Sequence, residues 1–582
     1  MAPQLRILSN VIERLKNIKN GVTGHLYGVM YDNTLTVLTF SVNIMNNIEV
    51  NINHTMLQLH MSAEVYLCGI LHVGECEEKF IDAFQDIDIT DNPLFLKYTH
   101  DNLKIQAYFY IHLKLESIND IKIINESDIC QEFIYIRLRG SLPLIAQDDN
   151  IMEVLKESRK NIVSGKIGIH FPSKNAFLFN NENIVKDISL KEILNISDNY
   201  EGTRNIKKNM KPMGIVNAVN AYILLKMSGD KHSEDNIKYA PVLQYIKRSF
   251  NSLECNLFID TLSLVNINVS SADLYGILVE SMCRNIKLVE KCFENQLQRS
   301  ETPIKLPIPI HFKPQGFGHL ITVVYPNGYS DKETKYRENL HKILGLDMTR
   351  PYFRCGNAVK FYNDSKTESI LISPHEAIVI NDDIINSNWK VQIVQGLYIY
   401  YHYMQDNFDD NGWGCAYRSL QTIISWFRLQ GYTEIPVPSH RVIQKCLVDI
   451  GDKPSNFINS KQWIGSTEVG FVLESLLDIS VKVLCASTGE EVSSLAPNLL
   501  HHFQTQGTPI MIGGGVLAHT ILGISYDQIT GDVKFLILDP HYVGPEHLPT
   551  VINKGWCGWK SKDFWKKDAF YNMCLPQRPV CI

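Results

Sequence analysis

The sequence predicts an α+β protein with more than one domain. Its 582 residues exceed the roughly 250–300 residues at which a single hydrophobic core usually stops growing. The first 150 residues carry mostly strand-like alternation and turn signals, whereas helical spacing of apolar residues appears in the middle and near the C-terminal end. An apolar content of 45% and a charged content of 20% are ordinary for folded domains. Two or three domains are therefore expected, and disorder is excluded for most of the chain.

The first element expected is an amphipathic helix within residues 1–20. Four apolar residues share its face: Leu5, Leu8, Ile12 and Leu15. This stretch has no uninterrupted apolar run, so no secretory signal peptide is expected. A second apolar stretch, 508–526, is broken by three glycines and by His519, and two buried strands explain it better than a membrane span.

A β-hairpin is expected next. Strands over 26–30 and 35–40 flank Asp32 and Asn33, the kind of polar pair found at a hairpin tip. The remaining elements of this stretch alternate in type. The further strands expected are 65–73, 103–115 and 133–138, and the helices are 77–84 and 151–160.

The middle of the chain carries two polar stretches, 198–211 and 227–236, the second preceded by a short apolar helix. Loop insertions are therefore expected near 198–240. A long helix capped by Ser271 or Asp273 follows and ends near Gln298. After it strand structure over 308–325 and a helix over 330–344 are expected. These signals divide the chain into an N-terminal region, 1–300, a connecting segment, 301–379, and a C-terminal domain, 380–582.

Charge and cysteine usage exclude several classes of protein. The 56 Lys and Arg against 62 Asp and Glu give a net charge of -6, and no dense basic run offers a track for phosphates, so nucleic acid is not expected as a partner. The 13 cysteines form no CxxC pair and no paired Cys/His spacing, so neither a zinc site nor a disulfide framework is expected. An odd number of cysteines scattered along the chain is typical of proteins in a reducing compartment.

The segment 401–427 carries the clearest chemical signal. After Gly414 the apolar residues recur on one helical face, which puts Cys415 at the N-terminus of a helix. Unpaired amide groups and the positive end of the dipole favour a thiolate there. Gly412 and Gly414 allow a tight turn before it and close approach of a substrate backbone. Cys415 is thus a candidate nucleophile, although a buried cysteine is equally common.

A thiolate also needs a base and a group that orients the base. Asp539 and His541 follow a buried strand over 533–538, and because residues two apart in an extended chain face the same side, they can lie together. His519, on the preceding apparent strand, gives the papain order of Cys, then His, then acid. Spacing alone leaves the choice between His519 and His541 open.

The strings DNGWGCAYRS and LDPHY, with YHYMQD before them and QWIGSTE between them, resemble the papain-like cysteine proteases specific for the ubiquitin-fold modifier. The resemblance is dense over residues 380–582. HLITVVYP and the RPYFR block are also similar to the long, type 2 form of this protease. GWGC and DPH occur in the autophagin proteases too, but there the residues after GWGC differ and the Tyr-rich segment is absent. An autophagin-like enzyme is the nearest alternative.

This resemblance implies roles for individual residues. Cys415 is the implied nucleophile, His541 the general base and Asp539 its orienting acid. Tyr403 is the implied oxyanion donor together with the Cys415 amide, with Tyr401 as the competing assignment. Further positions carry no settled role: His519 is implied to be a neighbouring groove residue, Gln405 matches a polar family position, and Trp413 and Trp463 either wall a slot for glycine or simply pack.

The resemblance also implies substrates, partners and a location. The expected substrates are the ubiquitin-fold modifier precursor and proteins conjugated to the modifier, cleaved without metal or cofactor. The N-terminal region is similar to a metal-free MPN-like domain, and residues 1–300 hold no H-x-H metal pattern. The resemblance implies that the protein is cytoplasmic and is recruited to the endoplasmic reticulum membrane through an adaptor protein, with the nucleus as a second location. A noncatalytic scaffold is the competing class.

Overall fold

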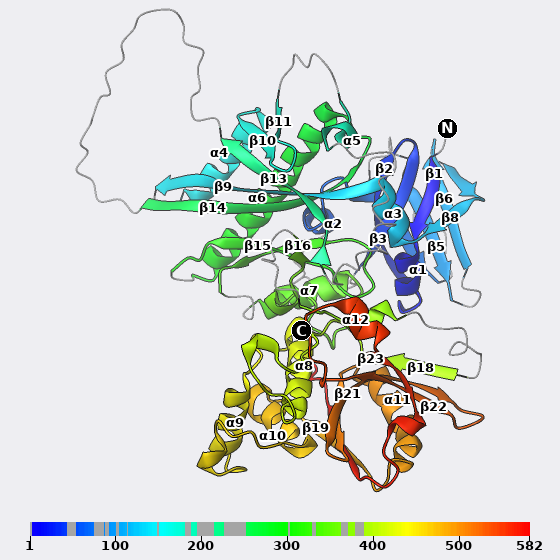
Figure 1. Ribbon diagram of the computed structural model, residues 1–582. Helices are drawn as coiled ribbons and strands as arrows, with labels where there is room; N and C mark the ends of the chain where they lie inside the picture. Colours follow the sequence, from blue (N-terminus) through cyan, green and yellow to red (C-terminus); the bar gives the residue numbers. More distant parts are fainter. Residues whose placement is uncertain are drawn as a thin grey trace, which may run out of the picture. The chain divides into compact units, whose positions relative to one another are not determined.

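The computed structural model describes residues 3–43, 54–74, 87, 92–100, 104–112, 114–147, 150–180, 188–194, 215–225, 252–300, 303–328, 333–362, 370–378 and 389–582. They form two compact units, the first holding most of the chain up to Asp347 and the second holding Met348–Lys360 and the described residues from 370 onward. Both units mix helices and strands, which confirms the α+β class (Figure 1). The three-part division at residues 300 and 380 stays a prediction.

The first unit contains an eight-stranded sheet built around the predicted hairpin. β2 (Val22–Tyr31) and β3 (Thr34–Val42) pair antiparallel, and Asp32 and Asn33 between them have φ of 45° and 54°. Two successive positive φ values make the type I′ turn that suits a twisted hairpin, and Asn and Asp tolerate this region better than most residues. The strand order is β7-β6-β5-β4-β2-β3-β1-β8.

The N-terminal helix expected within residues 1–20 is only partly present. β1 (Gln4–Leu8) forms a strand that pairs parallel with both β3 and β8 (Ile121–Ile124), and α1 (Ser9–Leu15) begins after it. Leu5, Ile7 and Leu8 are buried. Pairing on both sides of β1 outweighs the local helical spacing of its leucines, because that pairing satisfies its backbone and buries its apolar residues.

A five-stranded sheet, β11-β10-β13-β9-β14, forms the second part of this unit. β9 (Phe133–Gln147) and β14 (Ser252–Asn266) pair antiparallel along their full lengths. β13 (Ala218–Leu225) pairs parallel with β9, so the short apolar helix expected before residue 227 is wrong. The polar stretches expected as loops, 198–211 and 227–236, and the helix expected at 77–84 lie outside the described residues.

The long predicted helix is α6 (Ser271–Gln298), which packs along the five-stranded sheet (Figure 1). Its cap is Ser270, whose hydroxyl accepts a hydrogen bond from the Asp273 amide at 3.1 Å, one residue earlier than expected. The strand structure expected over 308–325 is present as two antiparallel strands. The elements after α6 are β15 (Pro307–Phe312), β16 (Ile321–Pro326) and α7 (Thr334–Ile343).

The other elements of this unit complete the two sheets and flank them. They are α2 (His54–Leu59), β4 (Tyr66–Val73), β5 (Leu94–Thr99), β6 (Lys104–Ile111), β7 (Lys114–Ile118), α3 (Glu126–Glu132), α4 (Ile151–Val163), β10 (Ile167–Phe171), β11 (Ala176–Phe179) and α5 (Leu190–Ile193). Two short strands, β12 (Ile215–Val216) and β17 (Lys360–Phe361), pair with each other.

The second unit is built on one seven-stranded sheet. Six strands follow the order β19-β24-β20-β21-β22-β23, and the seventh, β18, pairs with β21. The strands are β18 (Trp389–Ile393), β19 (Val481–Ala486), β20 (Ile510–Gly514), β21 (Leu517–Asp527), β22 (Val533–Leu538), β23 (Cys557–Ser561) and β24 (Tyr571–Pro576). Thr520 of β21 pairs with Leu538 of β22, so the start of one strand lies beside the end of the next.

Two hydrophobic cores cover the two faces of this sheet, because alternate strand residues point to opposite sides. Met511 joins the core shared with α8, α9 and α10, whereas its neighbours Ile510 and Ile512 join the core shared with α11. The helices are α8 (Cys415–Leu429), α9 (His440–Asp449), α10 (Ser466–Leu477), α11 (Ala496–Thr505) and α12 (Leu548–Asn553). α8 packs against β20 and β21, which brings its first turn to the start of β21.

No helix in the described part of the chain is both long enough and apolar enough to cross a membrane. The apolar stretch 508–526 forms most of β20 and β21, two buried strands as the sequence predicts.

Candidate active site

Cys415 is the first residue of α8, as its sequence predicts. Gly414 is the N-cap and supplies no side chain to the free amide groups of the first turn. Those amides and the helix dipole therefore remain available to a negative charge at the thiol. The thiol is buried, and helix residues of the same face pack into the core beneath it. The helix thus holds the sulfur in a fixed position.

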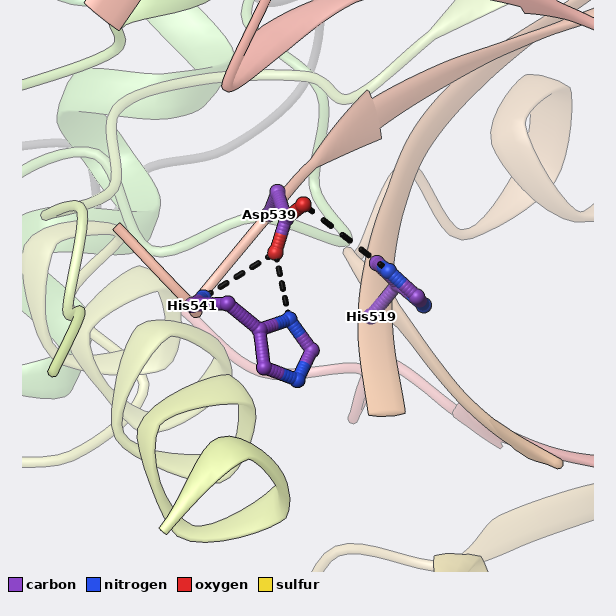
Figure 2. A group of neighbouring side chains, drawn as sticks. All are labelled: His519, Asp539 and His541. Carbon is purple, nitrogen blue, oxygen red and sulfur yellow. Dashed lines mark hydrogen bonds and ion pairs between the residues drawn. The ribbon is translucent and has the colours of Figure 1, made fainter. Parts of the chain in front are cut away.

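Asp539 follows the last residue of β22, and His541 lies two residues further on. Asp539 Oδ1 accepts a hydrogen bond from His541 Nδ1 at 2.6 Å and one from the His541 backbone amide at 3.0 Å (Figure 2). This pairing assigns the proton of the neutral imidazole to Nδ1 and leaves Nε2 as the basic nitrogen. Nε2 is buried and has no conventional hydrogen-bond partner among the described residues, and the imidazole interacts with the thiol of Cys415.

His519 lies beside the same carboxylate without reaching it. Its Nε2 is 3.9 Å from Asp539 Oδ2 (Figure 2), and its ring centroid is 5.3 Å from that of His541. Phe564 and Trp565 pack edge-on against the ring, and burial lowers the pKa of His519 to about 4. Of the two candidate bases, His541 is the one that interacts with the thiol and His519 is a neutral neighbour of the acid.

The charges of the site support an ion pair between thiolate and imidazolium. Burial alone would raise the pKa of the Cys415 thiol, but His541, the Tyr403 hydroxyl and the Ala518 backbone amide outweigh it and lower that pKa below its ordinary value. Burial alone would lower the pKa of His541, but Asp539 and Cys415 outweigh it and raise it to about 9. Both shifts favour the same charged pair.

Tyr403 completes the group around the sulfur. Its backbone amide donates to Pro540 O at 3.0 Å, and its ring meets that of His541 edge-on at 5.3 Å. The hydroxyl interacts with both the thiol and the backbone amide of Cys415. Burial is the largest cause that raises the pKa of Tyr403, and the Cys415 thiol is the next. Burial raises the pKa of Tyr401, and the charged groups that influence its hydroxyl are Asp406, Arg428, Arg418 and Glu546 rather than Cys415. Tyr403 is therefore the tyrosine at the sulfur.

A second network braces the segment that carries Tyr403. His402 is buried, and its Nδ1 and Nε2 lie 2.9 Å from Tyr403 O and 3.0 Å from Glu546 Oε1. Gln405 donates to the same Glu546 oxygen at 2.5 Å and accepts from the His402 amide at 2.9 Å. Gln405 thus ties the tyrosine segment to the loop after His541, a role that its sequence position did not reveal.

A cavity of about 200 Å³ opens at the thiol. Trp413, Cys415 and Trp463 line it together with Gly513 and Gly514 of β20. Trp413 is buried, whereas Trp463 is 56% exposed and its Nε1 donates to Gly412 O at 3.3 Å. Both tryptophans therefore border the space in front of the sulfur, and their selectivity for glycine stays a prediction.

His519, Asp539 and His541 could also hold a metal ion by ligand type, since their ligand atoms all lie within 4.8 Å of one another. The Asp539 oxygen nearest His541 is already engaged with that imidazole at 2.6 Å. The expectation that the protein needs no metal stays a prediction.

Family models match three stretches of the chain. A model described as Peptidase family C78 matches residues 389–574, which carry the whole group around Cys415. The insect UFM1-specific protease N-terminal MPN-like domain matches residues 1–129, and the N-terminal model of ubiquitin-fold modifier 1 specific protease 2 matches residues 162–366.

The chain is 36% identical to the probable Ufm1-specific protease 2 of Drosophila pseudoobscura pseudoobscura over 616 residues, an alignment that covers 100% of both chains. It belongs to the Ufm1-specific protease 2 family. The human Ufm1-specific protease 2 is 44% identical over 381 residues, 65% of this chain and 78% of the human one. The crystal structure of UfSP from C. elegans shares the fold, with a TM-score of 0.68 and 24% identity over 100% of both chains.

Membership of the Ufm1-specific protease 2 family makes the protein a cysteine peptidase with an MPN-like N-terminal domain and a C78 catalytic domain, as the sequence resemblance implies. Three contributors to the site are not among the residues that the sequence singles out. Ala518 acts through its backbone amide, which does not depend on the identity of its side chain. Glu546 and Asp410 act through contacts with the segment before Cys415. A repeated Asp in DNFDDNGWGC was the available hint for Asp410.

Proposed function

We propose that this protein is a thiol protease that cleaves after the C-terminal glycine of the ubiquitin-fold modifier, both maturing the precursor and releasing the modifier from conjugated proteins. The observation that carries the proposal is the group around one sulfur: the Cys415 thiol with His541, Asp539 and the Tyr403 hydroxyl. The relatives that match along the chain carry the name Ufm1-specific protease 2, which supports the substrate.

In the proposed reaction the Cys415 thiolate attacks the glycine carbonyl carbon and forms a C–S bond. The Tyr403 hydroxyl and the Cys415 backbone amide donate hydrogen bonds to the resulting oxyanion. When this intermediate collapses the C–N bond breaks, and the His541 imidazolium gives its proton to the departing amine. His541 then takes a proton from water, which attacks the thioester, and the C–S bond breaks to regenerate the thiolate. Asp539 holds the imidazole in place throughout.

A panel of modifier precursors tests the proposed substrate. The full-length protein is expected to cleave the ubiquitin-fold modifier precursor at its terminal glycine, at least about 100-fold faster by kcat/KM than precursors of the autophagy modifiers or of ubiquitin. Intact mass reads the cleavage position. Preference for an autophagy modifier would favour the autophagin-like alternative, and a wild type that cleaves no precursor would favour the noncatalytic scaffold.

We further propose that the N-terminal region recruits the enzyme from the cytoplasm to the endoplasmic reticulum through an adaptor protein, with the nucleus as a second location. The match of residues 1–129 to an MPN-like model supports an interaction role, as does the absence of an H-x-H pattern from residues 1–300. The full-length protein is expected to sediment with microsomes, but not with protease-shaved microsomes or with liposomes of the same lipids. Equal sedimentation with the liposomes would contradict an adaptor.

A further inference from the structure

Both proposed oxyanion donors belong to one strained segment, the chain from Tyr403 to Cys415. Three of its non-glycine residues, Met404, Asp406 and Asn407, have positive φ of 63°, 59° and 54°. Asp and Asn tolerate this conformation better than most residues, but Met404 adopts it only where surrounding contacts hold it there. The spacing between the Tyr403 hydroxyl and the Cys415 amide therefore depends on whatever fixes this segment.

Asp410 contacts the segment at both ends. Its carboxylate Oδ1 accepts a hydrogen bond from the Met404 amide at 2.8 Å, directly after Tyr403. Its backbone carbonyl accepts from the amides of Trp413 at 3.2 Å and Gly414 at 2.9 Å, directly before Cys415. One residue thus links the chain on the hydroxyl side of the oxyanion site to the chain on the amide side.

The Asp410 carboxylate is buried and lies between the side chains of Arg418 and His440. It is 0% exposed, and its Oδ2 accepts from Arg418 Nε at 2.6 Å and lies 3.1 Å from His440 Nε2. Burial alone would raise the pKa of Asp410, but His440 and Arg418 outweigh it and lower that pKa, so the group is a carboxylate. A Cβ on Gly414 would lie 2.5 Å from Oδ2. The carboxylate is therefore packed closely against the backbone of Gly414.

We infer that Asp410 is a positioning residue that sets the spacing of the two oxyanion donors, the Tyr403 hydroxyl and the Cys415 amide. The inference rests on the proposed function. Asp410 touches neither the thiol nor His541 in any contact of the described structure. It holds the segment through Met404 and Gly414, and its charge adds to the burial and the Cys415 thiol that raise the pKa of Tyr403. Its contribution belongs to the transition state, and modifier binding does not depend on it.

A double-mutant cycle with Asp410→Asn and Tyr403→Phe tests this inference. Asn keeps the shape of Asp410 but turns an NH₂ or an uncharged oxygen toward Arg418. We expect Asp410→Asn to lower kcat on the modifier precursor about 10- to 100-fold with KM unchanged. In the Tyr403→Phe background the same change should cost less than about 3-fold, because the donor it positions is gone.

Asp409→Asn, the same change at the exposed neighbouring residue, is the matched control and should keep wild-type kcat. An equal cost of Asp410→Asn in both backgrounds, or a raised KM, would overturn the inference. If Asp410→Asn does not fold, Gly414→Ala decides instead, since its Cβ displaces the same carboxylate; it should show the same non-additivity. A wild type that cleaves no precursor removes the proposed function and this inference with it, whereas an active wild type with an additive cycle removes the inference alone.

Discussion

Cys415→Ser is expected to abolish cleavage of the modifier precursor, lowering kcat/KM by about 10⁴-fold or more, while leaving the affinity for the modifier at its wild-type value. The hydroxyl of serine ionises far less readily than a thiol, so the ion pair with His541 is lost and no nucleophile forms at neutral pH. The buried position at the start of α8 stays filled by a side chain of similar size. Turnover is measured by intact mass and affinity by calorimetry.

Cys485→Ser is the control for this change, because Cys485 is an exposed thiol on β19 of the same unit. It should keep wild-type turnover. Retained cleavage by Cys415→Ser would remove the nucleophile assignment, and loss of modifier affinity together with turnover would mean that the substitution damages the binding surface.

The parts of the fold that were predicted correctly depend on local chemistry. Asp32 and Asn33 accept positive φ, so the hairpin of β2 and β3 is fixed within the residues that form it. The apolar face after Gly414 fixes α8, because one helix face must be buried whatever it packs against. In both places the local pattern and the tertiary structure agree.

The parts that were wrong depend on distant partners. β1 carries helical spacing but lies between β3 and β8, which come from residues about 30 and 115 further along the chain. β13 carries an apolar run that suits a buried helix or a strand equally, and only its pairing with β9 decides. Such pairings leave no local trace in a single sequence.

The candidate site divides in the same way. Cys415 is identified by its place in a helix, and Asp539 and His541 by two-residue spacing after a strand. Spacing alone leaves the choice between His519 and His541 open, because both lie near the same carboxylate, and only the resemblance implies His541. In the structure the two differ in their distances to Asp539 and in the interaction of His541 with the Cys415 thiol. The braces Asp410 and Glu546 bind backbone and amide groups, which any sequence offers.

His541→Ala and His519→Ala are expected to differ sharply in reactivity with a modifier that carries a C-terminal electrophile. The wild type and His519→Ala should form a covalent adduct at Cys415 by intact mass, whereas His541→Ala should react at least about 10³-fold more slowly. His541 lowers the pKa of the Cys415 thiol and, as an imidazolium, carries the proton that the departing amine needs. His519 is neutral and is not among the groups that shift the thiol pKa. Loss of the adduct only with His519→Ala would establish the papain order of residues instead.

The pH dependence of the same variants separates a base from a structural histidine. In the wild type the imidazolium of His541 persists up to a pKa of about 9, so kcat/KM for precursor cleavage should rise through the lowered thiol pKa and fall as pH passes about 9. His541→Ala leaves burial as the main influence on the thiol and should move the midpoint of Cys415 alkylation upward. His519→Ala should keep the wild-type midpoint, because a histidine that is neutral near pH 7 adds no charge to the thiolate. An alkylation midpoint that stays put in His541→Ala would mean that the helix N-terminus and the Tyr403 hydroxyl, rather than an imidazolium, hold the thiolate.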